Sequence, residues 1–168
     1  MARIGRQAGR ARDRGGNVAA VGEGGGAKGM SEITKALSVR APWAWAIMRG
    51  KPVENRDWPT NFRGVIWLHQ GKTWKQAEID DDWESIQYMA GDDGLILSTV
   101  DWEAMKAACG CIIGSVEIID CVRAHPSAFF VGEYGFVLRN PVPLETPIPF
   151  KGALSFFSVP ASLIGDAA

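Results

Sequence analysis

The segment from Leu37 to Lys72 places several short structural elements within 36 residues, and it constrains the fold more than any other part of the chain. Pro42 is favourable in the first turn of a helix, and Gly50 is a natural residue at which a helix ends. Pro52 cannot donate a hydrogen bond within a sheet, so a strand that follows it directly is short or lies at an edge. The segment therefore predicts, in order, a strand at 36–39, a helix at 42–50, a strand at 53–56, a turn at 58–61 and a strand at 65–69.

The rest of the chain predicts two further helices and three further strands. The helices are expected at 74–90 and 101–108, and the strands at 111–122, 135–138 and 153–159. Between the last two strands, the four prolines of PVPLETPIP exclude regular pairing and predict an extended crossing at an edge. Strict alternation of strands and helices is missing, which argues against a doubly wound sheet. We expect an α+β fold, a small mixed or antiparallel β-barrel of five or six strands with flanking helices.

Composition and charge narrow the class of protein. The chain has 168 residues, 46% of them hydrophobic, which is enough for one domain with a core. A formal net charge of -1 argues against a protein held on nucleic acid by bulk charge, so any nucleic-acid site must be local. No apolar run approaches the ~20 residues that a membrane span needs. Three cysteines without a paired spacing indicate reduced thiols in a cytoplasmic protein, and the two histidines show no metal-ligand spacing. We expect no metal and no cofactor.

The first 29 residues differ from the rest, because they hold nine glycines and five arginines but few large apolar side chains. Such a segment cannot bury enough surface to offset its ordering entropy, so residues 1–29 are predicted to be disordered and residues 30–168 to form the domain. Two translation starts, Met1 and Met30, stay open. A basic arm that touches phosphates is the functional alternative for this segment.

The candidate site lies where cations and aromatic rings interleave. Lys51, Glu54 and Arg56 follow the helix stop, and the latter two share a face of the predicted strand. The simplest interpretation is an exposed ion pair beside a turn; the functional one is a Lys and an Arg that bind phosphate or carbonyl oxygens. Trp67 is expected in the core. The candidate ligand-binding residues are Arg40, Trp43, Lys51, Glu54, Arg56, Trp58 and Tyr134, and the candidate catalytic residues, if the protein is an enzyme, are Lys51, Glu54 and His69.

Five separated blocks resemble the ASCH domain, a branch of the PUA-like superfamily: LSVRAPWAWAIMRGKPVENRDW, FRGVIWLHQGK, GCIIGSVEIIDCV, FFVGEYGFVL and GALSFFSVP. They cover residues 36–160, and the family's Gly-x-Lys-x-x-Glu-x-Arg signature is present in compressed form from Gly50 to Arg56. The resemblance implies a β-barrel with a cleft beside the first helix that binds RNA, DNA or modified nucleobases. Some similar members are amidohydrolases of acylated cytidine or ribonucleases. Lys51 matches the amidohydrolase Lys, whereas Glu54 stands where those members have Thr.

Three functions follow as hypotheses. The first is a binding module for RNA foremost, or for another single-stranded nucleic acid or a modified nucleoside, with Lys51 and Arg56 on oxygens and Trp43 or Trp58 as a stacking face. The second is an enzyme acting on RNA or acylated cytidine, with Lys51 as base or electrophile. The third is a protein-interaction domain whose acidic helix 74–90 binds a partner.

Overall fold

The computed structural model describes residues 33–162, so the predictions for residues 1–29 lie outside the described part of the chain. Within that part, six strands and three helices form an α+β fold, as expected. The strands are β1 (Lys35–Val39), β2 (Val53–Arg56), β3 (Gly64–Gln70), β4 (Cys111–Val122), β5 (Tyr134–Pro149) and β6 (Phe156–Ser158), and the helices are α2 (Trp43–Met48), α3 (Gln76–Asp93) and α4 (Trp102–Ala107).

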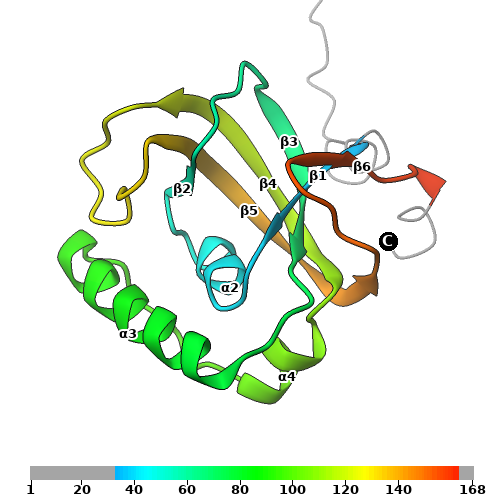
Figure 1. The fold of residues 1–168 in the computed structure, drawn as a ribbon. Helices are drawn as coiled ribbons and strands as arrows, with labels where there is room; N and C mark the ends of the chain where they lie inside the picture. Colours follow the sequence, from blue (N-terminus) through cyan, green and yellow to red (C-terminus); the bar gives the residue numbers. More distant parts are fainter. Residues whose placement is uncertain (1–32, 163–168) are drawn as a thin grey trace, which may run out of the picture.

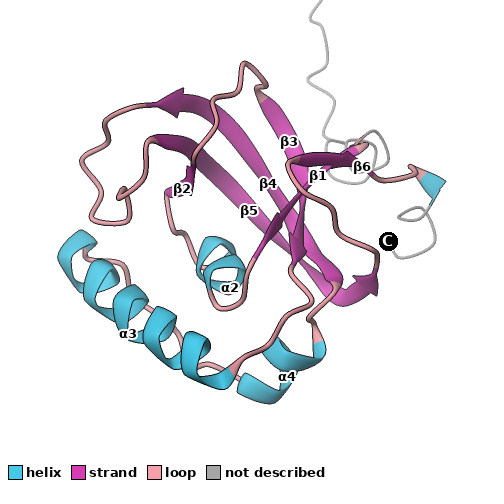
Figure 2. Cartoon of the chain, in the orientation of Figure 1, coloured by secondary structure: helices cyan, strands magenta, loops and turns pink. Residues whose placement is uncertain are grey.

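All six strands belong to one curled sheet in the order β2-β5-β4-β3-β1-β6, which forms a partial barrel (Figure 2). The sheet is mixed, because β1 pairs in parallel with β3 while the other neighbours are antiparallel. The short strand β2 lies at one edge, as the proline before it predicts. The parallel pair places Ser38 of β1 beside His69 of β3.

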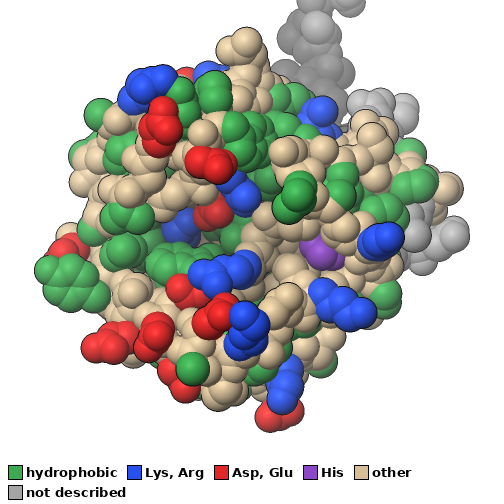
Figure 3. Space-filling view, in the orientation of Figure 1, with side chains coloured by type: hydrophobic (Ala, Val, Ile, Leu, Met, Phe, Trp, Pro, Cys, Tyr) green, Lys and Arg blue, Asp and Glu red, His purple; other side chains and the backbone are tan. Residues whose placement is uncertain are grey.

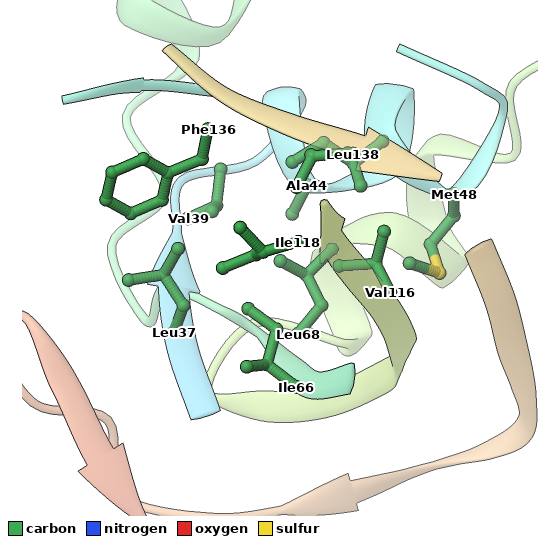
Figure 4. Packing of buried hydrophobic residues seen from close by; sticks show 11 residues of the cluster. Leu37, Val39, Ala44, Met48, Ile66, Leu68, Val116, Ile118, Phe136 and Leu138 are labelled. Carbon is green, nitrogen blue, oxygen red and sulfur yellow. The ribbon is translucent and has the colours of Figure 1, made fainter. Parts of the chain in front are cut away.

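The main core fills the inside of the curl, where α2 packs against the sheet (Figure 4). Side chains from four strands and from α2 point toward one another there: Leu37, Val39, Ala44, Met48, Ile66, Leu68, Val116, Ile118, Phe136 and Leu138. A second cluster packs α2 against α3 and α4, which lie along one side of the molecule (Figure 1). Trp67 is fully buried in a third cluster, and its indole N–H donates to the carbonyl of Ile33 at 2.9 Å. The expectation that Trp67 belongs to the core is confirmed.

Three predicted elements differ from the structure. The proline-rich segment PVPLETPIP is wrong as a crossing, because it continues β5, which pairs with β4 through an irregular register. The partner strand β2 reaches only Val137, so among residues 33–162 the far edge of β5 has no strand neighbour, and a proline there removes no ladder bond. Helix α3 runs through Gly91 to the left-handed Gly94, and β6 begins only after Ser155, whose φ is 55°.

Within residues 33–162, no helix is both long and apolar enough to cross a membrane.

Candidate functional site

A cavity of about 580 Å³ lies between β1, α2, β2 and α3 and brings together residues from distant parts of the sequence. Five of the candidate residues line it: Arg40, Trp43, Lys51, Glu54 and Arg56. Figure 3 shows the face of the molecule that is hollowed, with acidic and basic side chains gathered in and around the hollow. Among the residues that the structure describes, no group of His, Cys, Asp or Glu is placed to hold a metal ion.

The sharp turn after α2 positions the cationic residues. Gly50 has a φ of 105°, which side chains larger than hydrogen rarely adopt, and the N–H of Lys51 then donates back to the carbonyl of Ala46 at 3.0 Å. The chain enters β2 directly afterwards, and the two-residue period of the strand places Glu54 and Arg56 on the same face. A short helix, one glycine and a four-residue strand are therefore sufficient to gather three charged side chains.

Lys51 and Glu54 form a buried ion pair on the floor of the cavity. The Lys51 ammonium lies 2.6 Å from Glu54 Oε2, and the two side chains are only 1% and 11% exposed. The interpretation of this pair as exposed beside a turn is wrong, because the rings of Trp43 and Phe129 cover the ammonium at 5.4 and 5.9 Å. Burying two ions is costly unless each one is paired and hydrogen-bonded, so the pair is part of the structure as well as of the site.

Arg56 extends this cluster toward β1. One of its terminal nitrogens donates to the carbonyl of Ser38 at 2.9 Å and lies 3.3 Å from Glu54 Oε1. Its Nε is buried and finds no acceptor among the described residues. Two cations thus share one carboxylate, and the floor carries one positive charge in excess. This excess positive charge is suited to an anionic or carbonyl oxygen of a ligand.

Arg40 lies at the rim, where its charge is already matched. It bonds Glu78 at 3.1 Å and Asp82 at 3.0 Å, and its side chain is 58% exposed. Glu78 is also paired with Lys75, which lies 2.7 Å away. The hydrogen bond between them is the main reason that the pKa of the Glu78 carboxyl lies below its ordinary value. The acidic face of α3 therefore borders the cavity, and Arg40 has no free charge for a ligand.

Three candidate residues lie outside this cavity. Trp58 packs edge-on against Phe136 and Phe156, at 5.0 and 5.3 Å between ring centroids, and so closes the main core. Tyr134 lies across from Arg56 in the β2–β5 pair, but its hydroxyl accepts a hydrogen bond from Arg123. His69 lines a second cavity on the other side of β1.

Ser38 and Asn55 are among the lining residues that escaped the sequence analysis. Ser38 borders both cavities, and a hydroxyl within the otherwise apolar strand ALSV was the only available signal. Asn55 ties β2 to the loop after β4: its amide nitrogen donates to Phe129 O at 2.8 Å, and its oxygen accepts from the N–H groups of Val131 and Gly132 at 3.0 Å. Nothing in the sequence pairs Asn55 with a loop more than 70 residues away.

Comparison with known proteins places the chain in a family. The chain is 29% identical over 126 residues to activating signal cointegrator 1 of Mus musculus and to the same protein of Homo sapiens. The match covers 69% of this chain, but the chain spans only about a fifth of the length of these relatives, 20% in each case. The family model of the ASCH domain matches residues 37–140, which include β1 from Leu37 onward, β2 and the Lys51–Glu54–Arg56 cluster. The chain therefore belongs to the ASCH domain family.

Proposed function

We propose that the protein is a nucleic-acid-binding module that holds one unpaired nucleotide, of RNA foremost, in the cavity between β1, α2, β2 and α3. The observation that carries this proposal is the buried Lys51–Glu54–Arg56 cluster, whose excess positive charge faces a cavity lined by Trp43. A ligand that suits it has an anionic or carbonyl oxygen for Arg56 and a flat surface for the indole. A nucleotide has both.

The cavity has the size to hold one unpaired nucleotide, but not a base-paired duplex. Its volume of about 580 Å³ lies within the range of roughly 300–1,000 Å³ that small-ligand pockets occupy. A base inside a duplex cannot enter such a pocket without leaving its stack, whereas an unpaired base can. Single-stranded RNA exposes bases in this way, and its 2′-hydroxyl offers a further group to recognise.

The charge distribution favours local recognition over bulk attraction. The formal net charge is -1, and the acidic residues of α3 border the cavity, so the surface does not attract a long polyanion. Binding should therefore lose little affinity as salt rises, because few phosphates are neutralised. The three cysteines in the described chain are free thiols, which agrees with function in a reducing cytoplasm.

The test is a titration of tryptophan emission with single-stranded RNA of about eight nucleotides, with DNA of the same sequence, and with cytidine. We expect saturable binding that prefers RNA. Arg56→Gln should weaken it about 10- to 150-fold, since hydrogen bonds to charged groups contribute about 1.5–3 kcal/mol. The matched control is Arg139→Gln, which removes an equal charge from an arginine paired with Glu117 outside the cavity. Absence of saturation with every ligand would refute the proposal.

The alternative that the protein is a hydrolase is distinguished from the proposed binding module by whether products form. The same protein is incubated with N-acylated cytidine and with labelled RNA, and products are followed by chromatography. Binding without conversion supports the proposed module. Conversion that disappears in Lys51→Met would replace it with an enzyme in which the buried Lys51 contacts the substrate.

A further inference from the structure

A second and larger cavity, of about 870 Å³, lies on the opposite side of β1. Ser38 borders both cavities, with its carbonyl held by Arg56 in the first and its side chain lining the second. His69 also lines the second cavity, and only 2% of its surface is exposed. A buried histidine that the proposed nucleotide site does not use therefore lies beside a serine.

The hydrogen bonds of the imidazole define its tautomer. His69 Nε2 lies 2.9 Å from the carbonyl oxygen of Phe150, and because a carbonyl can only accept, Nε2 carries the proton. In the neutral ring Nδ1 is then bare, and it accepts the hydroxyl proton of Ser38, whose Oγ lies 2.9 Å away. The parallel register of β1 and β3 fixes this contact, since Ser38 and His69 are direct neighbours across the two strands.

We propose that Ser38 and His69 form a nucleophile and general-base pair that hydrolyses carboxylic esters through an acyl-serine intermediate. The pair satisfies the geometric requirement, a hydroxyl within hydrogen-bond reach of a base that a third group orients. Burial lowers the pKa of His69 below 6.5, so the ring is neutral and able to accept a proton at neutral pH.

The reaction proceeds in two balanced halves. Ser38 Oγ forms a bond to the ester carbonyl carbon while its proton moves to His69 Nδ1, and the carbonyl π electrons become the oxyanion. Collapse of the tetrahedral intermediate breaks the bond to the alkoxy oxygen, which takes the proton from Nδ1 and leaves as an alcohol. Water then attacks the acyl-serine and gives a proton to Nδ1, and Ser38 recovers it as the carboxylic acid departs.

The lining of the cavity indicates the class of ester. Pro149, Phe150 and Leu154 provide apolar surface, and Lys72 and Lys151 add two cations that favour a substrate with a negatively charged group. The ring is oriented by a neutral carbonyl rather than by a carboxylate, so little stabilises an imidazolium. Esters, whose alkoxide leaves more readily than an amine, are therefore the expected substrates, and amides are not.

The loop after β5 closes over the pair. A Cβ added to Gly152 would lie 2.7 Å from Ser38 Oγ and 2.5 Å from His69 Cε1, so only a glycine lets this loop approach so closely. The backbone N–H groups of Lys151, Gly152 and Ala153 have no acceptor among the residues that the structure describes. The oxyanion that develops beside Ser38 requires donors of this kind.

A second cluster that contains a serine and a histidine has a different pattern of hydrogen bonds. Ser127, His125 and Asp93 line a third, smaller cavity. The hydroxyl of Ser127 donates to the carboxylate of Asp93, and His125 Nδ1 accepts the backbone N–H of Ser127 at 3.2 Å. Since no imidazole accepts that hydroxyl proton, Ser127 lacks an activating base and serves as the matched control.

The test measures ester hydrolysis and covalent labelling by the 168-residue chain. p-Nitrophenyl butyrate reports turnover, and a fluorophosphonate probe followed by peptide mass spectrometry locates the reactive serine. We expect the label on Ser38 and turnover that Ser38→Ala abolishes, while His69→Gln slows both about 100-fold or more. Ser127→Ala should retain full turnover and labelling.

The pair would be refuted if the label lay on another residue, or if Ser38→Ala hydrolysed the ester as fast as the unaltered protein. Ser38→Cys guards against a loss of folding, because it keeps the side chain size. Its thiol should react with iodoacetamide at neutral pH at least about tenfold faster than the same thiol in Ser38→Cys/His69→Gln, because the imidazole generates the thiolate. Equal rates would also overturn the proposal, and melting curves show that each variant is folded.

Discussion

The two cavities on either side of β1 differ in whether their charged groups are buried or exposed. In the first, ionised groups are buried: Lys51 is 1% exposed and its partner Glu54 is 11% exposed. In the second, the buried polar group is a neutral imidazole, while the cations Lys72 and Lys151 are exposed. Ser38 connects the two cavities, since its carbonyl accepts a hydrogen bond from Arg56 in the first and its hydroxyl donates one to His69 in the second.

This difference teaches how each cavity is coupled to folding. A buried ion contributes to stability only while its partner is present, so a substitution on the floor of the first cavity changes both binding and stability. A neutral hydrogen-bonded pair carries a smaller penalty when one partner is removed, so the second cavity can lose its chemistry and keep its fold. The predictions below test this separation.

The largest effect is expected at Trp67, which lies in β3, the strand that also carries His69. Trp67→Ala should lower the free energy of unfolding by ~3–5 kcal/mol, because it empties a fully buried site and removes the hydrogen bond to Ile33. Urea unfolding followed by circular dichroism measures the loss. Nucleotide binding and ester hydrolysis should fall together, in proportion to the folded fraction, and a loss in only one of them would show that β3 does not serve both cavities equally.

The next effect distinguishes buried from exposed ion pairs. Lys51→Met should cost about 1.5–3 kcal/mol, since it removes the buried 2.6 Å hydrogen bond to Glu54 and leaves that carboxylate to Arg56 alone. Lys75→Met is a matched control, because Lys75 also pairs with a glutamate three residues later, but on the surface, and it should cost ~0–1 kcal/mol.

The double variant Lys51→Met/Glu54→Gln should be no more stable than Lys51→Met, because removal of the carboxylate leaves the Arg56 guanidinium without its ion-pair partner. Chemical denaturation of the unaltered protein, Lys51→Met, Glu54→Gln and the double variant measures the coupling. Equal small losses for Lys51→Met and Lys75→Met would contradict the structural role of the buried pair.

The sequence predicted the elements of the first cavity well, for a physical reason. Pro42, Gly50 and Pro52 fix local backbone conformation wherever they occur, so they located α2 and the edge strand β2 without knowledge of the fold. The same local reasoning failed for PVPLETPIP, because whether a proline disturbs a sheet depends on which strands flank it. That depends on topology, which local sequence does not report.

The sequence also failed to predict which residues are buried and which distant residues come into contact. Lys51 seemed exposed from its place at a turn, and only the rings of Trp43 and of the distant Phe129 make it buried. Ser38 acquires an activating base only through the pairing of β1 with β3, 31 residues away. Trp58, a large ring in a polar loop, packs into the core instead of lining the cavity.

A smaller effect is expected from Gly152→Ala, which changes the second cavity alone. The added methyl group would press on Ser38 Oγ and His69, and overpacking of this kind costs typically about 1–3 kcal/mol. Labelling of Ser38 by the fluorophosphonate should decrease strongly, while the affinity for RNA stays within about twofold. Gly91→Ala is the control, because nothing lies near its Cβ position. A parallel loss of RNA affinity would show that the two cavities are not separable.

The smallest effect concerns the dependence of stability on pH. Burial lowers the pKa of His69 below its ordinary value of 6.5, so the folded protein binds fewer protons at this ring than the unfolded chain does. The contribution of His69 to stability is therefore complete above pH 6.5 and is lost as the pH falls below that value toward the lowered pKa. His69→Gln should remove this part of the pH dependence, which urea unfolding at about pH 7.5 and about pH 5.5 measures. An unchanged slope in His69→Gln would mean that the imidazole is not held neutral, and the hydroxyl of Ser38 would then have no base.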